Sequence, residues 1–442
     1  MTEPVRPRGV ALDGIALDGI VLDVIAEPGT DPVGWRLTLT SDDRPAETAE
    51  TVTPEAVASR WLADQLTVGT APELPDALQE KGFRLQRFGR PVSSPAPGER
   101  LIATQQTNRS VVVGEQVIVK WMHRMDDADH PALRAARHLD DVGFAGVPAT
   151  LGALTWRSPS ERELPCAFVT DFQPGAVDGW QWCVQALEND DRPGFPAELG
   201  LLTAQLHVAL GTPTSRLPLP MLAVGAAQLT SWHAQARQRL DELTEQIGAL
   251  DDAPAGQEGD RPQYVPSVVL ALHHKLMESV IDQLLDVRGR TPVQLIHGDL
   301  HVGQVLSWVG GLSVTDFDGS PVLGTTSARQ PAARDVAQML LSLDQVGRVV
   351  DRKSGFTRTA EMNDWSGVAR EQFLTAYRGE LERVERPDVL DTRLLPSFLV
   401  EQACRDLLYT VRFLPRWAYA TIDGLETILN DLPKPIERTL DV

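Results

Sequence analysis

The segment 297–304 constrains this chain more than any other part of its sequence, and it reads HGDLHVGQ. It places a carboxylate at Asp299 and an amide at Gln304, and the segment TDFDG that begins at Thr315 adds a second carboxylate at Asp316. Phosphoryl transfer needs one carboxylate to orient the acceptor hydroxyl, and an amide oxygen with a further carboxylate to hold magnesium on the phosphates. The spacing supplies all three groups and indicates phosphoryl transfer.

Two other interpretations fit parts of the same segment. His297 and His301 alternate with Asp299 as metal ligands do on one side of an extended segment, so a metal-dependent hydrolase is an alternative. The other alternative is a plain turn after an apolar strand expected at 293–296. The sequence holds no second His and carboxylate cluster that would complete a hydrolase site, and a turn does not explain the ordered set.

Composition excludes several classes of protein. The 442 residues can bury a large core in two or three domains, and 42% hydrophobic with 23% charged residues is typical of soluble globular proteins. A formal charge of −20 argues against nucleic acid as a partner and weakly favours a cationic small substrate. We expect a monomer or small homo-oligomer.

Location is indicated by what the sequence lacks. No apolar run approaches the length of a membrane span, and the N-terminus shows no basic then apolar signal segment. The three cysteines are widely spaced and form no paired motif, which suits reduced thiols. We therefore expect a cytoplasmic protein without a membrane partner.

Residues 1–98 read as a small appended cap subdomain. The pentapeptide ALDGI occurs at 11–15 and again at 16–20, and its alternating apolar residues fit strands and turns. A further strand is expected at 35–40, and Thr53 is suited to cap a helix that begins with Pro54. A Pro-rich and Ser-rich linker closes this segment.

Residues 99–185 are predicted to form a β-rich lobe. Strands are expected at 101–104, 111–113 and 117–120, and Lys120 lies at the end of the third. The hairpin tip 107–110 is rich in amide and hydroxyl groups that can cover phosphates, although it lacks a glycine-rich motif. A strand at 164–170 leads into a Pro-Gly turn that reads as a hinge facing an adenine. The expected nucleotide contacts are Lys120, Thr107, Asn108, Arg109, Ser110, Val169 and Asp171.

Residues 186–442 are predicted to form a helical lobe. Apolar residues recur at helical spacing at 199–210, 226–250 and 267–285. Further helices are expected to begin at Ala333 and to cover 398–414. The order of the elements predicts an α+β, bilobal protein kinase-like fold, with a β-rich N-lobe, a hinge and a helical C-lobe after the cap.

The motifs resemble those of a known family. The loop 297–304, the DFDG segment and the tetrapeptide RDVA at 334–337 are similar to those of aminoglycoside phosphotransferase-like kinases. Within that superfamily, Gln304, the segment 178–180 and the tail 401–417 resemble actinobacterial maltokinases and their glucosamine kinase relatives. The resemblance covers about residues 100 to 420, and the N-terminal cap of maltokinases would match 1–98.

The resemblance implies ATP and Mg²⁺ as cofactors and gives each residue a role. It makes Asp299 the base or hydroxyl-orienting carboxylate, and it makes Gln304 and Asp316 magnesium ligands. It makes Asp318 a second metal ligand or a sugar contact. Lys120 would contact the ATP phosphates.

The resemblance also implies supporting residues and one departure. His297 would hold the loop geometry, and Asp335 would accept hydrogen bonds from that loop. Kinases usually pair the strand lysine with a helix glutamate, but the segment 131–137 carries arginines instead. Either an acid among Asp126, Asp127 and Asp129 takes that place, or Lys120 is held by phosphate alone.

The acceptor site is expected around the C-terminal tail. Glu401, Tyr409 and Trp417 offer a carboxylate, a phenol and an indole, which suit a sugar, although Glu401 and Arg405 alternatively form a surface ion pair. Asp299, Asp318 and Glu401 together favour an amino sugar, because charge-assisted hydrogen bonds to an ammonium group are strong. We therefore expect a glucosamine kinase. Alternatives are a maltokinase, an aminoglycoside phosphotransferase, and a non-catalytic nucleotide-binding protein.

Overall fold

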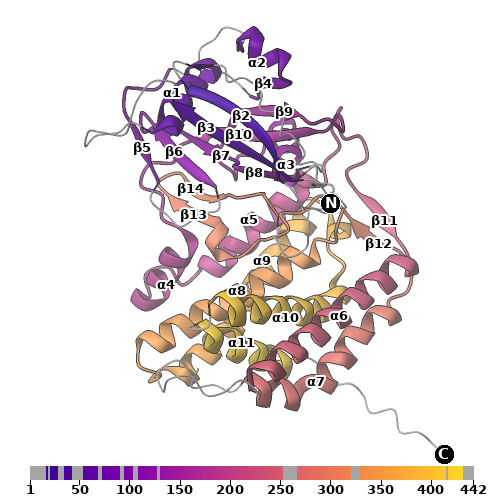
Figure 1. Cartoon of the computed structure of the whole chain (residues 1–442). Coiled ribbons are helices and arrows are strands. Elements are labelled where there is room, and N and C mark those ends of the chain that lie inside the picture. Colours follow the sequence, from indigo (N-terminus) through magenta and orange to yellow (C-terminus); the bar gives the residue numbers. More distant parts are fainter. Residues whose placement is uncertain are drawn as a thin grey trace, which may run out of the picture. The chain divides into compact units, whose positions relative to one another are not determined.

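The computed structural model describes residues 16–17, 20–27, 34–41, 53–67, 72–89, 94–102, 108–126, 130–251, 266–319, 329–414 and 417–431. The chain divides into two compact units. The N-terminal unit comprises 1–176 and 308–327, and the C-terminal unit comprises 177–307 and 328–442. Figure 1 shows that the strands labelled β2 to β10 belong to the first unit and that the second unit is largely helical.

The N-terminal unit is built on a six-stranded antiparallel sheet. In spatial order its strands are β4 (Phe83–Arg87), β9 (Thr150–Arg157), β10 (Glu163–Asp171), β7 (Val117–Trp121), β6 (Arg109–Val113) and β5 (Glu99–Leu101). β6 and β7 are rich in β-branched valines, which favour strands. They pair so that Ser110 lies opposite Lys120. The predicted hairpin is confirmed, and its third strand contains Lys120.

A second sheet of four strands lies in the same unit. Its strands are β1 (Ala16–Leu17), β2 (Ile20–Glu27), β3 (Gly34–Ser41) and β8 (Arg124–Asp126). The first copy of the ALDGI echo and the start of the Pro-rich linker lie outside the described residues. Because β4 precedes residue 98 and pairs with β9, the six-stranded sheet draws on both sides of the predicted boundary. The division into 1–98, 99–185 and 186–442 stays a prediction.

The described part of the N-terminal unit also contains three helices, namely α1 (Pro54–Thr67), α2 (Asp76–Glu80) and α3 (Pro131–Val142). α1 buries Leu62 and Leu66 fully in the same core as Trp121 of β7. The indole nitrogen of Trp121 donates a 2.9 Å hydrogen bond to Oγ of Ser59 on α1. This contact satisfies the one polar group that the tryptophan carries into the core.

The C-terminal unit contains eight α-helices among its described residues. They are α4 (Gly179–Asn189), α5 (Phe195–Leu210), α6 (Ala226–Asp251), α7 (Pro266–Asp282), α8 (Ala333–Lys353), α9 (Thr359–Arg383), α10 (Leu395–Phe413) and α11 (Ala418–Asp431). Short 3-10 turns are η1 (Gln283–Asp286), η2 (Val302–Gln304), η3 (Pro387–Val389) and η4 (Thr392–Leu394). The strands of this unit are β11 (Leu222–Val224), β12 (Thr291–Val293) and most of β13 (Val305–Trp308), whereas the partner of β13, β14 (Gly311–Val314), belongs to the N-terminal unit.

Most predicted helices of this unit are confirmed, and one predicted strand is misplaced. The strand expected at 293–296 is wrong in its bounds, because β12 ends at Val293. Gln294 continues instead in an isolated bridge to Gln330, where each backbone N–H donates to the other's carbonyl. The strand therefore ends before His297, which lies buried in the loop that follows.

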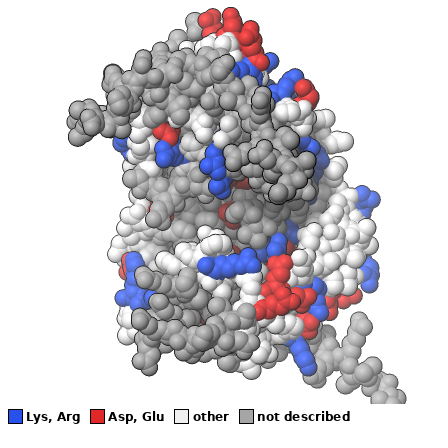
Figure 2. Space-filling model, viewed as in Figure 1, with Lys and Arg blue, Asp and Glu red and all other residues white. Residues whose placement is uncertain are grey.

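The described surface mixes both signs of charge. On the face shown in Figure 2, acidic and basic side chains lie beside one another. Cys166, Cys183 and Cys404 are buried free thiols, and burial raises the pKa of each above the usual range. No helix among the described residues has the length and apolar character needed to cross a bilayer.

Candidate active site

One face of α8 holds the loop that carries the central motif. The carboxylate of Asp335 accepts hydrogen bonds from the backbone N–H groups of His297 (2.8 Å) and Gly298 (2.9 Å). Oγ of Ser342 accepts from the N–H of Val302 at 3.1 Å. Asp335 and Ser342 are seven residues apart, so both side chains project from the same face of the helix. The prediction that Asp335 accepts hydrogen bonds from this loop is confirmed.

Asp299 is oriented by the same helix. Nε2 of Gln338, three residues after Asp335 on α8, donates a 2.7 Å hydrogen bond to Oδ1 of Asp299. The backbone N–H of Asp299 donates to Nδ1 of His297 at 3.3 Å. His297 thus holds the loop geometry, and the neutral amide of Gln338 fixes the carboxylate without cancelling its charge.

A buried series of hydrogen bonds connects Asp335 to His207 and Tyr377. Nε2 of His207 on α5 lies 3.1 Å from Oδ2 of Asp335, and Nδ1 of His207 lies 2.6 Å from the hydroxyl of Tyr377 on α9. Because a carboxylate only accepts, Nε2 of His207 carries the proton and Nδ1 accepts from Tyr377. All three side chains are at most 1% exposed.

Ionisation of these side chains follows from their contacts. Burial raises the pKa of Asp335, but the hydrogen bond from His207 and electrostatic attraction from the two histidine rings, together with the hydrogen bond from the Gly298 N–H, outweigh it and hold the pKa below its usual value. Burial, and then the charge of Asp335, raises the pKa of Tyr377 well above its usual value. Asp335 is therefore ionised and Tyr377 neutral over the ordinary pH range.

α4 packs tightly on the far end of the loop. A Cβ added at Gly179, the first residue of α4, would lie 1.5 Å from the carbonyl oxygen of Val302, so only glycine fits there. The indole nitrogen of Trp182 donates to the carbonyl oxygen of Val305 at 2.9 Å. Gln304 lies between these contacts in η2, and its N–H donates to the carbonyl oxygen of His301 at 2.9 Å.

The alternative of a surface ion pair between Glu401 and Arg405 is wrong in its location, because both side chains are buried. Glu401 is only 2% exposed, and its two carboxylate oxygens accept from Nη1 of Arg334 on α8, both at 3.0 Å. The guanidinium of Arg334 also lies 4.3 Å from the ring centroid of Phe398. Sequence spacing favoured an i to i+4 pair, whereas the tertiary contact between α8 and α10 gives Glu401 a buried partner.

Asp406 is a candidate site residue that the sequence interpretation missed. It is half-buried on α10, and it accepts from Nε2 of Gln402 at 2.8 Å and from Nε2 of Gln345 at 3.4 Å. Burial raises the pKa of Asp406 to about 6; Asp299 adds to the rise, while Gln402 and Arg405 oppose it. The electrostatic coupling to Asp299 associates Asp406 with the loop. Its spacing of four residues from Gln402 was the available signal.

Two aromatic side chains of the predicted acceptor site are partly open to solvent. Tyr409 follows Asp406 by three residues on α10, and its ring centroid lies 5.1 Å from that of Phe413. Trp417 stacks on Tyr419 with centroids 6.5 Å apart. Tyr409 is 45% and Trp417 47% exposed, so both keep ring surface available for a ligand.

The N-terminal unit gathers a second charged cluster around Lys120. Nζ of Lys120 lies 2.6 Å from Oδ1 of Asp316 and 2.7 Å from Oδ2 of Asp318. The amide of Asn108 donates to the same oxygen of Asp318 at 3.1 Å. Burial lowers the pKa of Lys120, but the charges and hydrogen bonds of the two carboxylates outweigh it and leave the pKa raised.

Comparison with known proteins places the chain. No family model matches it. A glucosamine kinase of Streptacidiphilus jiangxiensis is 36% identical over 382 residues, which cover 82% of both chains. A glucosamine kinase of Mycolicibacterium smegmatis (strain ATCC 700084 / mc(2)155) is 35% identical over 350 residues, covering 77% of this chain and 82% of the other. The chain belongs to the glucosamine kinase family.

A solved structure supports this membership. A glucosamine kinase in complex with glucosamine, ADP and inorganic phosphate matches with a TM-score of 0.72 and 30% identity, covering 93% of this chain and 91% of that one. A second structure, glucosamine kinase in crystal form B, gives a TM-score of 0.73 with 30% identity, covering 93% of this chain and 92% of that one. The predicted α+β kinase-like fold and the predicted family are confirmed.

Other predicted nucleotide contacts have different surroundings. Arg109 forms an ion pair with Glu55 of α1, so its charge is directed to that helix. Ser110 is buried, and Thr107 lies outside the described residues. These three contacts stay predictions.

The predicted hinge residues lie at the end of β10. Val169 is fully buried and paired in the middle of the sheet. Asp171 donates its N–H to the carbonyl oxygen of Ala149 at 2.9 Å and lines a cavity of about 560 Å³ with Phe172 and Gln173. Burial raises the pKa of Asp171. Whether these residues contact adenine remains a prediction.

The donor types suit magnesium. Mg²⁺ prefers carboxylate and amide oxygens over nitrogen or sulfur ligands, and Gln304 of the C-terminal unit and Asp316 of the N-terminal unit each carry such an atom. Their role as magnesium ligands stays a prediction. Asp316 adopts a left-handed conformation with φ +68°, which is uncommon for a residue other than glycine. Strained conformations of this kind cluster at functional sites, so the backbone at Asp316 fits a metal-binding role.

Proposed function

We propose that the chain is an ATP-dependent kinase that phosphorylates glucosamine, forming glucosamine 6-phosphate. The glucosamine kinases to which it is 35–36% identical support this function, as does the similar structure that holds glucosamine, ADP and phosphate. The observation that carries most weight is local. Gln338 and Gln345, seven residues apart on α8, donate hydrogen bonds to Asp299 and to Asp406, a second acid suited to an amino sugar.

In this proposal Asp299 orients the acceptor hydroxyl and receives its proton. The sugar oxygen forms a bond to the γ-phosphorus of ATP while the bond from that phosphorus to the β,γ-bridging oxygen breaks, releasing ADP. The hydrogen bond from Gln338 leaves the charge of Asp299 in place, because an amide carries no charge. Asp335 and Ser342 keep the loop still, so the carboxylate is positioned before the substrate binds.

The phosphates are proposed to meet Lys120. Gln304 and Asp316 would hold magnesium, which supplies neutralising charge to the phosphate oxygens when bound. Lys120 adds a point charge, and its raised pKa keeps it protonated over the ordinary pH range. Asn108 lies beside this cluster and is the described tip residue best placed to act with Lys120.

The ammonium group of glucosamine is proposed to bind Asp406 rather than Glu401. Glu401 is buried and already neutralised by the guanidinium of Arg334. Asp406 is half-buried, and its hydrogen bonds come from the neutral amides of Gln402 and Gln345. The charge of Arg405 lowers its pKa but does not outweigh burial, so the carboxylate keeps negative charge for a cation. Tyr409, one turn further along α10, offers an exposed ring to the apolar face of the sugar, and Trp417 is a second candidate.

A transfer assay tests the function. The purified chain is supplied with ATP, MgCl₂ and either glucosamine, glucose, maltose or kanamycin, and ADP release is followed together with the mass of the product. Glucose is the matched control because it lacks only the amino group. We expect kcat/KM for glucosamine to exceed that for glucose by about a hundredfold, the range of a lost charged hydrogen bond.

The alternatives give different outcomes in the same assay. Turnover of maltose alone would identify a maltokinase, and turnover of kanamycin alone an aminoglycoside phosphotransferase. Binding of ADP without transfer to any of the four acceptors would indicate a non-catalytic nucleotide-binding protein. Asp299→Asn is expected to abolish transfer while ADP binding is kept, and near-normal rates in that variant would exclude Asp299 from the chemistry.

A further inference from the structure

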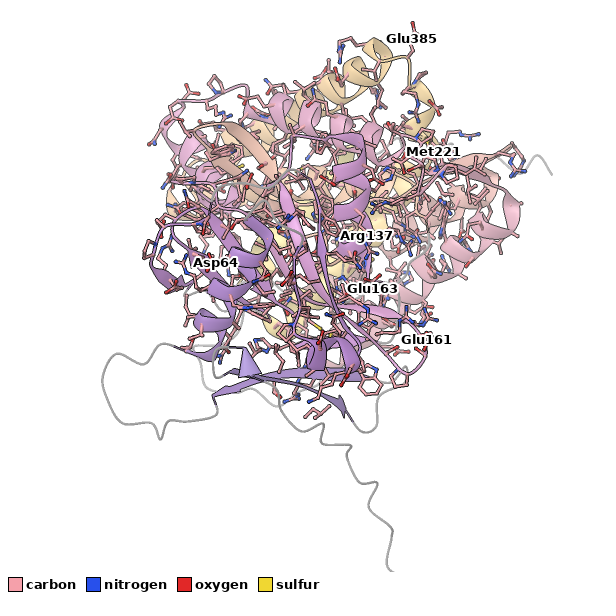
Figure 3. All side chains as sticks on the ribbon, turned by 90° about the horizontal axis from the view of Figure 1, so that it is seen from above. Asp64, Arg137, Glu161, Glu163, Met221 and Glu385 are labelled. Atoms are coloured by element: carbon pink, nitrogen blue, oxygen red, sulfur yellow. The ribbon has the colours of Figure 1, made fainter. Side chains whose placement is uncertain are left out.

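The helix that should hold Lys120 carries its acids, Asp140 and Asp141, only at its C-terminal end. The first turn of α3 contains no acidic residue, and Asp140 accepts a 3.0 Å hydrogen bond from the N–H of Gly89. Arg137 of the same helix donates a 2.9 Å hydrogen bond to Glu163 of β10. Figure 3 shows Arg137 and Glu163 beside each other. The contact between helix and sheet is therefore an ion pair in which the helix supplies the cation. A lysine on this sheet needs its carboxylate from elsewhere.

The segment after β14 supplies that carboxylate. Lys120 contacts Asp318 as closely as it contacts Asp316, at 2.7 and 2.6 Å. The side chain of Phe317 packs against the core of the N-terminal unit, which anchors the backbone between the two acids. The left-handed conformation at Asp316 turns the chain there, and both carboxylates reach the same ammonium group.

Space around α3 agrees with this arrangement. A Cβ added at Gly319 would lie 3.4 Å from Cγ of Pro131, the first residue of α3. The start of the helix thus lies directly against the residue that follows Asp318. At this contact α3 presents the apolar ring of Pro131, and the acid, Asp318, belongs to the neighbouring segment.

We propose that Asp318 replaces the absent helix acid as the positioning residue for Lys120, and that Asn108 fixes Asp318 in that place. The inference rests on the proposed nucleotide site and refines it. In this scheme Asp316 is the magnesium ligand, and Asp318 positions the ammonium group of Lys120 while Lys120 contacts phosphate. The carboxylate of Asp318, in the segment 315–319, then contacts both Lys120 of β7 and Asn108, the residue before β6.

A double-mutant cycle tests the link without requiring any sugar. The affinity for ADP in excess MgCl₂ is measured by calorimetry for the unaltered chain, Lys120→Met, Asp318→Asn and the double variant. We expect Asp318→Asn to weaken ADP binding by about three- to tenfold, less than the direct loss of a charged hydrogen bond, because Asp318 acts on the nucleotide only through Lys120. In the Lys120→Met background the same change should alter the affinity by less than about twofold, because the partner is gone.

A metal-ligand role for Asp318 predicts a different pattern. The loss would then persist without Lys120 and would shrink as the MgCl₂ concentration is raised. Either that pattern or unchanged or tighter ADP binding in Asp318→Asn would overturn the proposal. If Asp318→Asn fails to fold, Asn108→Ala and Asp318→Glu test it instead: the first should weaken ADP binding about two- to fivefold only while Lys120 is present. The second should retain most of the affinity.

The same sheet offers a matched control. Glu161 forms an exposed ion pair with Arg157 of β9, and Glu161→Gln removes one carboxylate without touching Lys120. Its ADP affinity should match that of the unaltered chain. If the chain binds ADP normally but transfers phosphate to no sugar, the proposed function fails while the cycle remains interpretable. A chain that binds no ADP would overturn both.

Discussion

The side-chain amide of Gln338 lies 2.7 Å from Oδ1 of Asp299, and it comes from the helix that also binds the loop backbone through Asp335. The helix α8 therefore both orients the proposed base, Asp299, and holds the loop that carries it. The orientation of Asp299 therefore depends on a residue thirty-nine positions away in the sequence.

Replacing Gln338 should impair turnover more than binding. Gln338→Ala removes the hydrogen bond that orients Asp299, so we expect kcat to fall about tenfold while the KM values for ATP and glucosamine change less than about twofold. Steady-state kinetics check this. Gln238→Ala is the control, because Gln238 is an exposed glutamine bonded to Glu242 on α6. An unchanged kcat in Gln338→Ala would remove the orienting role.

The hydroxyl of Tyr377 should contribute to stability and to catalysis. Tyr377→Phe leaves Nδ1 of buried His207 without the donor that lies 2.6 Å away, which costs about 1–3 kcal/mol of unfolding free energy. Urea unfolding measures this cost, and a smaller loss of kcat at constant KM is expected through Asp335. Tyr409→Phe, at an exposed ring, should shift stability by less than about 0.5 kcal/mol.

Asp406 should impose a pH dependence on the use of glucosamine. Only its ionised form attracts the ammonium group, so kcat/KM for glucosamine should rise as the pH increases through about 6, the pKa of Asp406. Asp406→Asn should lower kcat/KM for glucosamine and remove that rise, while leaving the KM for ATP nearly unchanged. A profile unaltered by Asp406→Asn would contradict the assignment.

Stability should depend on Asp406 in the opposite direction. Its folded pKa of about 6 exceeds the ordinary value of 3.8, so the folded state binds the proton more tightly than the unfolded chain does. Its contribution to stability is therefore present below about pH 4 and is lost as the pH rises to about 6. Asp406→Asn should consequently stabilise the chain at pH 7.5 by about 1–3 kcal/mol, measured by urea unfolding.

Gly179 should tolerate no side chain. Gly179→Ala brings Cβ to within 1.5 Å of the Val302 carbonyl oxygen, so α4 or the loop must move. We expect a loss of more than about 3 kcal/mol in stability, or a chain that does not fold. Gly248→Ala is the matched control on α6, where an added Cβ meets nothing within 4 Å; it should stabilise slightly. Equal stability of both variants would contradict the tight packing.

Glu401→Gln should act through stability more than through sugar selectivity. It leaves the buried guanidinium of Arg334 without its counter-charge, which costs about 3–5 kcal/mol. Thermal and urea unfolding report this loss. If the variant remains as stable as the unaltered chain but its KM for glucosamine rises strongly, then Glu401 contacts the sugar after all.

The sequence predicted the parts of the site that are encoded locally. The loop 297–304, the acids at 316 and 318 and the helical lobe follow from spacing and periodicity, and Asp335 was given its supporting role. The partner of Lys120 is nearly two hundred residues away in sequence, so no local pattern indicated it. Asp406 was not predicted, because the effect of Asp299 on its pKa arises from tertiary packing and leaves no local sequence pattern.

Asp335 and Ser342 hold the backbone of the loop, and Gln338 orients Asp299. The segment 297–304 therefore depends on α8 for its conformation. Grafted alone into another kinase scaffold, it would lose the helix that shapes it. An engineer who wishes to transplant this loop, or to recombine it with a homologue's, should move α8 with it. Crossover points placed before β12 and after Lys353 keep both pieces together, whereas a crossover within 303–333 separates them.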